Sequence, residues 1–328
     1  MEPSFVTYAF ALQGDDRGPV QSEDVLVQTL RADAPAWVHL DGTGHGVDTW
    51  IAEHLDYLDP QAIEALLDAD TRPRMNVLGS GMMLILREIN LNEGEDPEDM
   101  VSVRMWVDAH RIVTISRRRV RAIENISRAL GAGGGPETAG AFLVHLVEHL
   151  TQNIARFQSE LDANAEELEH KVIAHGGEAL RRQVVDMRLQ IIAARRYMGP
   201  QRDALASIIA APLDLIDKTT RREIQEEHVK MTRVVEDMDE LRDQAMILRE
   251  ELSGHLSDRL NRNMFVLSLL SVVFLPLGFL TGLFGVNVAG LPGLQDQDAF
   301  WWLCGAMGVL VMLQLLLFWR LRWIGRGG

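Results

Sequence analysis

The tripeptide Gly285-Val286-Asn287 ends a long apolar run and places an amide side chain at its end. Asparagine offers one carbonyl acceptor and one NH₂ donor without a net charge. If several copies surrounded one axis, a ring of such groups could hydrogen-bond the water shell of a divalent cation and still release it, as conduction requires. A plain helix C-cap, which both Gly and Asn favour, is the other interpretation of this tripeptide.

A seam of small and polar residues leads back from Gly285 in alternating steps of three and four. This heptad spacing keeps the residues on one face of a helix. A second, apolar ridge lies in another register of the same helix and can pack against neighbouring helices; it consists of Met238, Leu241, Ala245, Leu248, Leu252, Leu256 and Leu260. Within the apolar run, only Leu275 and Met264 on the seam are large and apolar, and further back the seam becomes acidic. The candidate pore-lining residues are Asn261, Met264, Ser268, Ser271, Leu275, Gly278 and Gly282, and the candidate cation-attracting residues are Glu236, Glu240, Asp243 and Glu250.

The seam has two interpretations. Small and polar groups in a membrane helix face either other helices or a water-filled path. An oligomer with the seam on its axis would enclose a narrow, partly acidic pore, with Leu275 as a hydrophobic gate. Asp296 and Asp298 would then raise the cation concentration at the outer mouth. Close helix packing through Gly and Ser, with a solvated acidic face, is the alternative.

Two uncharged runs, residues 264–285 and 300–319, are 22 and 20 residues long. A hydrocarbon core of about 30 Å needs about 20 helical residues, so both runs predict transmembrane helices. The loop between them has no Lys or Arg, whereas Arg259 and Arg262 precede the first span and three arginines follow the second. The positive-inside rule therefore predicts a bacterial inner-membrane protein with both termini in the cytoplasm.

The part of the chain before the first span is strongly acidic. The chain carries −15, and its last 65 residues hold three Arg and two Asp, so the first 263 residues carry −16. Nucleic acid requires a positive surface, so we expect no nucleic-acid partner. A cationic partner would suit this charge. The single cysteine, Cys304, allows no intrachain disulfide, which agrees with a reducing compartment.

Residues 1–135 mix strand and helix signals and predict an α+β cytoplasmic domain. Asp59 with Pro60 reads as a helix N-cap, and Asp108-Ala109-His110 reads as a hairpin turn. Runs rich in β-branched and aromatic residues predict strands, and two further runs predict helices. The strand candidates are SFVTYAFAL, AWVHLDG, GMMLILREINL, SVRMWVD and RIVTISR, and the helix candidates are VDTWIAEHL and PQAIEALLD.

The remainder is predicted to be helical. Residues 136–219 form a helical hairpin region, with a break at Gly176-Gly177, a kink or end at Gly199-Pro200 and a turn at Ala211-Pro212. One stalk helix of about 98 Å follows at 1.5 Å per residue. The predicted order is a stalk helix 220–285 that contains span 264–285, an external loop 286–299, a second span 300–320 and a basic tail 321–328.

Two other motifs could carry chemistry. His145 and His149 flank Glu148 with the H-x-x-E-H spacing of a zinc peptidase family, and two histidines at i and i+4 could share a metal. Because the downstream glutamates lie on the same predicted helix, we expect no enzyme, and a regulatory metal site is the weaker reading. The run 117–119 is three arginines, which we interpret as surface charge paired with acids rather than an anion site. No phosphate-cradling loop is present, and no cofactor is expected.

The Gly285-Val286-Asn287 motif after one span, followed by a short loop and a last span, resembles the CorA family of divalent-cation transporters. The stretches VFLPLGFLTGLFGVNVAGLPG (273–293), TRPR (71–74) and RRYMGPQRD (195–203) are similar to its zinc-transporting branch. Val286 departs from the Met that magnesium members carry there. Asp296 and Asp298 are not part of the loop pattern associated with the zinc branch.

This resemblance implies a homopentamer with an α/β cytoplasmic funnel, a pore lined by the stalk helix and Asn287 in a selectivity ring. It also implies zinc as the transported substrate, with cadmium, nickel or cobalt as further ions, and proton-coupled uptake. The seam itself offers only oxygen ligands, which suit magnesium better than zinc. A magnesium or cobalt channel of the same family and a membrane-anchored cytoplasmic sensor or scaffold are the alternatives.

Overall fold

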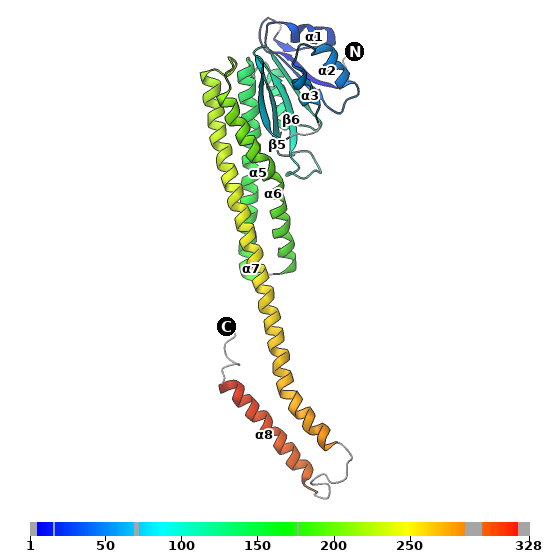
Figure 1. The fold of residues 1–328 in the computed structure, drawn as a ribbon, viewed down its shortest axis with the longest axis vertical. Coiled ribbons are helices and arrows are strands. Elements are labelled where there is room, and N and C mark those ends of the chain that lie inside the picture. Colours follow the sequence, from blue (N-terminus) through cyan, green and yellow to red (C-terminus); the bar gives the residue numbers. More distant parts are fainter. Residues whose placement is uncertain (1–4, 16, 69–71, 176, 286–296, 321–328) are drawn as a thin grey trace. The chain divides into compact units, whose positions relative to one another are not determined.

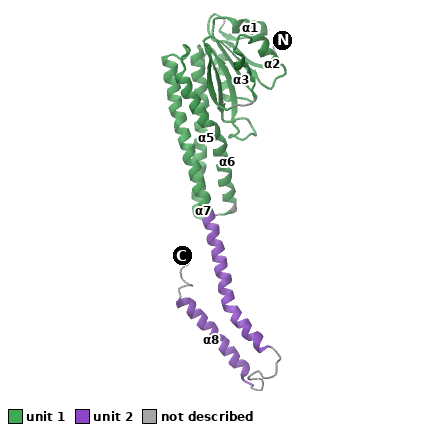
Figure 2. Cartoon of the chain, in the orientation of Figure 1, with its two compact units in different colours: residues 1–252 green, residues 253–328 purple. Residues whose placement is uncertain are grey.

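The computed structural model describes residues 5–15, 17–68, 72–175, 177–285 and 297–320. The chain forms two compact units, residues 1–252 and residues 253–328 (Figure 2). The helices are α1 (Glu23–Arg31), α2 (Val47–His54), α3 (Pro60–Leu67), α4 (Arg121–Gly131), α5 (Ala139–His175), α6 (Glu178–Ala210), α7 (Lys218–Phe284) and α8 (Ala299–Arg320).

The first unit contains a seven-stranded mixed sheet with the order β2-β1-β3-β7-β6-β5-β4 (Figure 1). Strands β3 and β7 run parallel, with Asp41 opposite Ser116, and the other neighbouring pairs are antiparallel. The strands are β1 (Val6–Ala11), β2 (Gly18–Pro19), β3 (Ala36–Asp41), β4 (Arg74–Leu78), β5 (Gly81–Glu88), β6 (Val101–Val107) and β7 (Arg111–Ser116).

Alternating side chains of the central strands build two cores, one on each face of the sheet. Met82 and Leu84 of β5 pack with α4, α5, α6 and α7. Met83 and Ile85 of the same strand face the other way and pack with α1, α2 and α3. The predicted α+β domain and the predicted helical region therefore share one core within the first unit.

The five predicted strands and the two predicted helices of the N-terminal part are confirmed. The Asp59 side chain caps α3 by accepting the Gln61 N–H at 2.8 Å, and Asp108 closes the β6–β7 hairpin by accepting the N–H groups of His110 and Arg111, each at 2.9 Å. Helix α1 and strands β2 and β4 were not predicted. Helix α1 has a local signal that was missed, because the Ser22 side chain caps it by accepting the Val25 N–H at 3.4 Å.

Helix α6 continues through Pro200, so of the two alternatives predicted at Gly199-Pro200, a kink or an end, the end is wrong. The following residue, Gln201, is almost fully buried and pairs with the backbone of Arg87 in both directions. Its Nε2 donates to the Arg87 carbonyl at 3.0 Å, and its Oε1 accepts the Arg87 N–H at 2.6 Å. The side-chain amide thus replaces a strand partner where β5 extends past β4, and this contact fixes α6 against the sheet.

Within the first unit, α7 separates its two predicted ridges. The apolar ridge packs into the core, where Met238, Leu241, Ala245, Leu248 and Leu252 are each at most 7% exposed. The acidic seam lies on another side of the helix and is exposed. Heptad spacing in the sequence therefore identified both faces of the helix correctly in this region.

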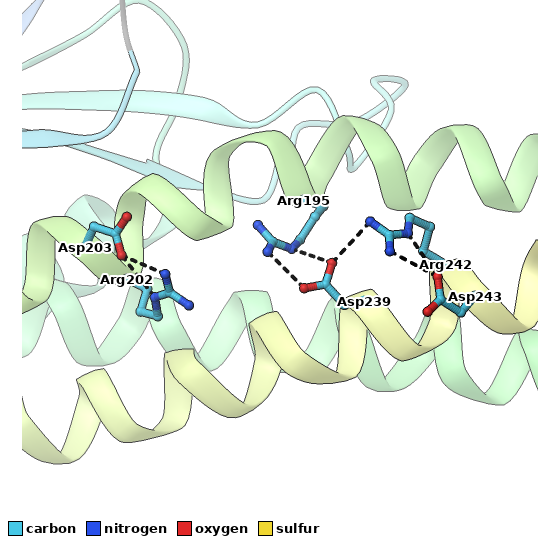
Figure 3. Close-up of polar contacts among 6 residues, drawn as sticks. All are labelled: Arg195, Arg202, Asp203, Asp239, Arg242 and Asp243. Atoms are coloured by element: carbon cyan, nitrogen blue, oxygen red, sulfur yellow. Dashed lines mark hydrogen bonds and ion pairs between the residues drawn. The ribbon is translucent and has the colours of Figure 1, made fainter.

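An ion pair connects α6 and α7 at the level of the acidic seam (Figure 3). The Arg195 guanidinium donates to both carboxylate oxygens of Asp239, at 3.1 and 2.9 Å. Arg242 also approaches Asp239, at 3.7 Å. These guanidinium groups hold the pKa of Asp239 below its usual range, with the Arg195 hydrogen bonds as the largest cause. Two-point recognition of this kind fixes the register of the two helices more than it stabilises them.

A buried carboxylate joins β5, α4 and α5. Glu88 is 1% exposed, and its carboxylate accepts the N–H groups of Arg121 at 2.6 Å and Ala122 at 3.2 Å and the Nδ2 of Asn153 at 2.5 Å. Glu88 therefore caps α4 from a distant strand, while the N-cap residue Val120 provides no side-chain bond. Burial raises the pKa of Glu88 to about 7, although its three donors oppose that shift.

Glu88 should make stability fall as pH rises. A folded pKa above the unfolded value of about 4.3 gives a contribution that is complete below that pH and is lost as pH rises through the folded pKa. Relative to Glu88→Gln, the free energy of unfolding of the unaltered protein should fall by up to about 3 kcal/mol between about pH 5 and pH 8. Thermal unfolding in detergent across this range measures the difference. Replacing the exposed Glu53 by Gln is the control, and parallel pH profiles for Glu88→Gln and the unaltered protein would contradict this assignment.

Candidate functional site

The second unit contains two apolar helical segments that its own fold does not bury. The C-terminal part of α7 and the whole of α8 are long and apolar enough to cross a membrane. Leu275 and Phe279 are 75% and 68% exposed in α7, and Trp301 and Trp302 exceed 70% in α8. So much apolar surface requires lipid or other chains around it.

Every predicted pore-lining position from Asn261 to Gly282 is exposed on the described chain. The Ser271 hydroxyl donates to the Leu267 carbonyl at 2.9 Å, within its own helix. Its proton is therefore satisfied internally, and the oxygen lone pairs remain free to accept hydrogen bonds from outside. The seam thus presents oxygen acceptors and small residues to an aqueous path or to a neighbouring helix.

Part of the predicted outer mouth lies outside the described residues, namely Val286, Asn287 and Asp296. Gly285 is described, and its N–H still bonds to the Thr281 carbonyl at 2.9 Å, so the helical hydrogen bonding extends to the motif. The Asp298 carbonyl accepts the first N–H groups of α8, from Trp301 and Trp302. Asp298 therefore stands at the start of the second span.

Gly278 borders a groove between α7 and α8, which the sequence did not indicate. With Phe274, Leu277 and Thr281 it borders an apolar groove of about 600 Å³ between α7 and α8, to which Gly308 also contributes. A Cβ added at Gly278 would meet no atom within 4 Å. The two helices of one chain therefore do not use this glycine for close approach.

A glutamine of α8 supplies a hydrogen bond that a proline of α7 removes. Pro276 has no N–H, so the carbonyl of Val272, four residues earlier, loses its helical donor. Gln314 Nε2 donates to this Val272 carbonyl at 3.1 Å. An unpaired carbonyl is unfavourable in hydrocarbon, so this contact both compensates for the proline and connects the two spans.

The predicted cation-attracting residues divide into two groups. Glu240 and Asp243 line a groove of about 700 Å³ between α5 and α7, opposite Asp162, Glu166 and Glu169. Glu236 and Glu250 are exposed outside this groove. Asp243 is partly neutralised because Arg242 donates to it at 3.0 Å (Figure 3). Among the described residues, no group of three or more acids, histidines or cysteines is arranged to hold a metal ion.

The histidine pair of α5 does not converge on a common point. The rings of His145 and His149 lie nearly parallel, at an interplanar angle of 18°, with their centroids 6.5 Å apart. Their nitrogens cannot both reach one metal without a change of rotamer, because zinc–nitrogen bonds are about 2.0–2.1 Å long.

The arginine run at residues 117–119 forms mostly the ion pairs that were predicted. Arg118 pairs with Asp99 and Glu95 at 2.9 Å, and Arg119 pairs with Glu124.

Residues 32–320 match the family model of CorA-like Mg²⁺ transporter proteins. The chain belongs to the CorA family. The zinc transport protein ZntB of Yersinia enterocolitica is 33% identical over 317 residues, which are 95% of this chain and 94% of that protein. The divalent cation transporter CmaX of Pseudomonas aeruginosa is 31% identical over 320 residues, 97% of this chain and 96% of that one. The structure of full-length CmaX superposes with a TM-score of 0.83 at 30% identity and covers 98% of this chain and 99% of that one.

Membership of the CorA family confirms the predicted architecture of a soluble α/β domain, a long helix and two C-terminal apolar helices. The resemblance inferred from the Gly285-Val286-Asn287 motif and the zinc-branch stretches is likewise confirmed.

Sequence reasoning missed Gln314. Its signal was present, because one amide stands inside an otherwise apolar span and a polar group in such a span needs an acceptor or donor there. Its partner was also predictable in part, because a proline at position 276 always leaves the carbonyl at position 272 without its helical donor. Which helix would supply the missing donor depended on how α8 pairs with α7.

The coupling between Gln314 and Pro276 can be measured by a double-mutant cycle. Gln314→Leu should destabilise the protein by about 1 kcal/mol, because it leaves the Val272 carbonyl without a donor. In a Pro276→Ala background the restored N–H satisfies that carbonyl, so the same change should have little effect. Thermal unfolding in detergent measures all four proteins. Equal effects of Gln314→Leu in both backgrounds would show that the contact does not serve the proline-freed carbonyl.

Proposed function

We propose that this CorA family member transports divalent metal cations, with zinc as the main substrate, along an axial pore formed by copies of α7 in a homopentamer. The observation that carries the proposal is the exposed seam on α7. It presents small and oxygen-bearing residues within the apolar segment and becomes acidic in the first unit. A helix that only anchored a domain would not need a polar face continuous with an acidic one.

The chemistry of the seam suits a cation that keeps its water shell. Ser268, Ser271 and Asn261 provide neutral oxygen acceptors, and Ser271 has its hydroxyl proton already donated to Leu267. Neutral acceptors bind a hydrated ion weakly enough to release it to the next position. Leu275 interrupts this polar series, so we assign to it the role of a hydrophobic gate that opens by wetting.

Charge at the two ends would concentrate the ion. Asp296 and Asp298 would attract cations to the outer mouth, where Asn287, with Gly285 and Val286, forms the selectivity ring. Exposed acids along α7 would attract cations at the cytoplasmic end. These are Glu236, Glu240, Asp243 and Glu250, with Asp243 weakened by its ion pair to Arg242.

Zinc is proposed because the ZntB relative is named a zinc transport protein. Passage of the hydrated ion reconciles zinc with a seam of oxygen ligands, because ligand softness matters little when water stays in the first shell. Cadmium, nickel and cobalt should then pass as well. Uptake would be proton-coupled. Since residues 264–285 contain no titratable side chain, protons would follow the same water path instead of a side-chain relay.

The oxygen-only seam also favours a second candidate within the family, a magnesium or cobalt channel. Hard oxygen ligands suit magnesium, and the family model itself is named for Mg²⁺. Parallel flux measurements with magnesium separate the two candidates. A membrane-anchored sensor is disfavoured by the continuous seam and would carry no flux.

Zinc flux into proteoliposomes tests the proposed selectivity ring at Asn287. With a zinc-sensitive dye inside, zinc should enter through the unaltered protein, faster with an inward proton gradient, and magnesium should enter more slowly. Asn287→Ala should reduce zinc entry at least tenfold, because the ring loses its acceptors. Asn263→Ala removes the same side chain one residue from the seam and should leave entry unchanged. If no divalent ion enters through the unaltered protein, the Gly285-Val286-Asn287 motif is only a helix cap.

Mass measurement tests the axial pore independently of transport. The detergent-solubilised protein should have about five times the chain mass of 36.8 kDa after correction for bound detergent. A dimer could not enclose a pore with one α7 from each copy, so a mass of twice the chain would favour the anchored sensor. Light scattering coupled to size-exclusion chromatography gives this value.

A further inference from the structure

One buried arginine in the first unit lacks a partner among the residues that the structure describes. Arg104 of β6 is 2% exposed, and it forms no hydrogen bond or ion pair with any residue that the structure describes. Its Nε is fully buried and unpaired. A guanidinium offers five donors, so this is an unusual deficit for a native core.

The charges around Arg104 make its burial less favourable still. Burial, with smaller contributions from the positive charges of Arg117 and Arg87, lowers the pKa of Arg104 to about 10, and Asp68 opposes the change. Asp68 itself lies 3.6 Å from Arg74. A buried charge is stable only when it is paired and hydrogen-bonded. Among the described residues, the charges that act on Arg104 are therefore more cationic than anionic.

The strand register explains why these cations meet. Arg104 pairs with Ile85 of β5 and with Ile115 of β7, so Arg117, two residues beyond Ile115, stands diagonal to it on the same face, whereas the Arg87 guanidinium lies over the Tyr197 ring of α6, 3.7 Å from its centroid. A Cβ added at Gly42 would meet both the Arg117 Cγ and the Ile115 side chain within 3.3 Å, which places Arg117 on that face.

Arg117 keeps donors available. Its one hydrogen bond is a long contact of 3.5 Å to the carbonyl of Leu67, the last residue of α3. Unlike Arg118 and Arg119, it forms no ion pair with the described residues. The C-terminal end of α3 therefore borders the same space as the two guanidinium groups.

We propose that Arg104 and Arg117 bind a small tetrahedral oxyanion, represented by inorganic phosphate, between β6, β7 and the C-terminal end of α3. Planar guanidinium forks match the oxygen spacing of such anions and can bind them in two-point fashion. The anion would neutralise the buried charge and join the Arg104 guanidinium of β6 to the Arg117 guanidinium that follows β7. This role is structural and does not depend on the proposed transport function.

Thermal unfolding of the full-length protein in detergent tests the site. Phosphate replaces chloride at constant ionic strength, and tryptophan fluorescence follows the transition. The unaltered protein should unfold about 2–4 °C higher when phosphate exceeds its Kd tenfold. Arg104→Met and Arg117→Gln should lose this increase. Arg104→Met should be at least as stable as the unaltered protein without phosphate, because an apolar residue of similar length removes the unpaired charge.

Arg119→Gln is the matched control, because this neighbouring arginine is exposed and already paired with Glu124. The Arg119→Gln protein should keep the phosphate-dependent rise in unfolding temperature. Equilibrium dialysis with labelled phosphate should find one site per chain in Arg119→Gln and none in Arg104→Met. Arg117→Gln provides the same test if Arg104→Met does not fold. The proposal is overturned if phosphate does not raise the unfolding temperature, if both site variants still respond, or if chloride stabilises equally.

Discussion

Burial of one ridge of α7 is the interaction on which the rest of the structure depends. Within the first unit, residues from Met231 to Leu252 insert an apolar ridge between α5 and α6 and complete the core under the sheet. Beyond that unit the helix continues, but its apolar residues stay exposed. A helix that changes its surroundings in this way needs one solvent for each part, water for the first and hydrocarbon or other chains for the second.

Polar groups that this architecture buries are satisfied one at a time, each by a residue from another element. Gln201 completes the edge of β5, Glu88 caps α4 and Gln314 serves the carbonyl that Pro276 leaves free. Each contact joins two elements that are distant in sequence, so satisfying a polar group also positions a helix. Arg104 is a buried charged group that lacks such a partner among the described residues, and the proposed anion would supply one.

The placement of polar and charged side chains along α7 also bears on the proposed ion path. Membership of the CorA family indicates transport, and the exposed face of α7 indicates where an ion could run. Its oxygen atoms are neutral in the apolar segment and charged only in the aqueous unit, which matches the high cost of charge in hydrocarbon. Among the residues that the structure describes, no group of three or more histidines, cysteines or acids is arranged to strip and hold zinc.

The sequence by itself determined the two spans, the separation of the apolar and acidic ridges of α7, the five main strands and the family. These features follow from local hydrophobic period and from a short motif, which each segment carries alone. Only the tertiary structure decided the parallel pairing of β3 with β7, the course of α6 through Pro200, and the partners of Glu88, Gln314 and Arg104. Such contacts join residues that are tens of positions apart, and no local pattern specifies which distant group will fill a given hydrogen bond or leave a charge unpaired.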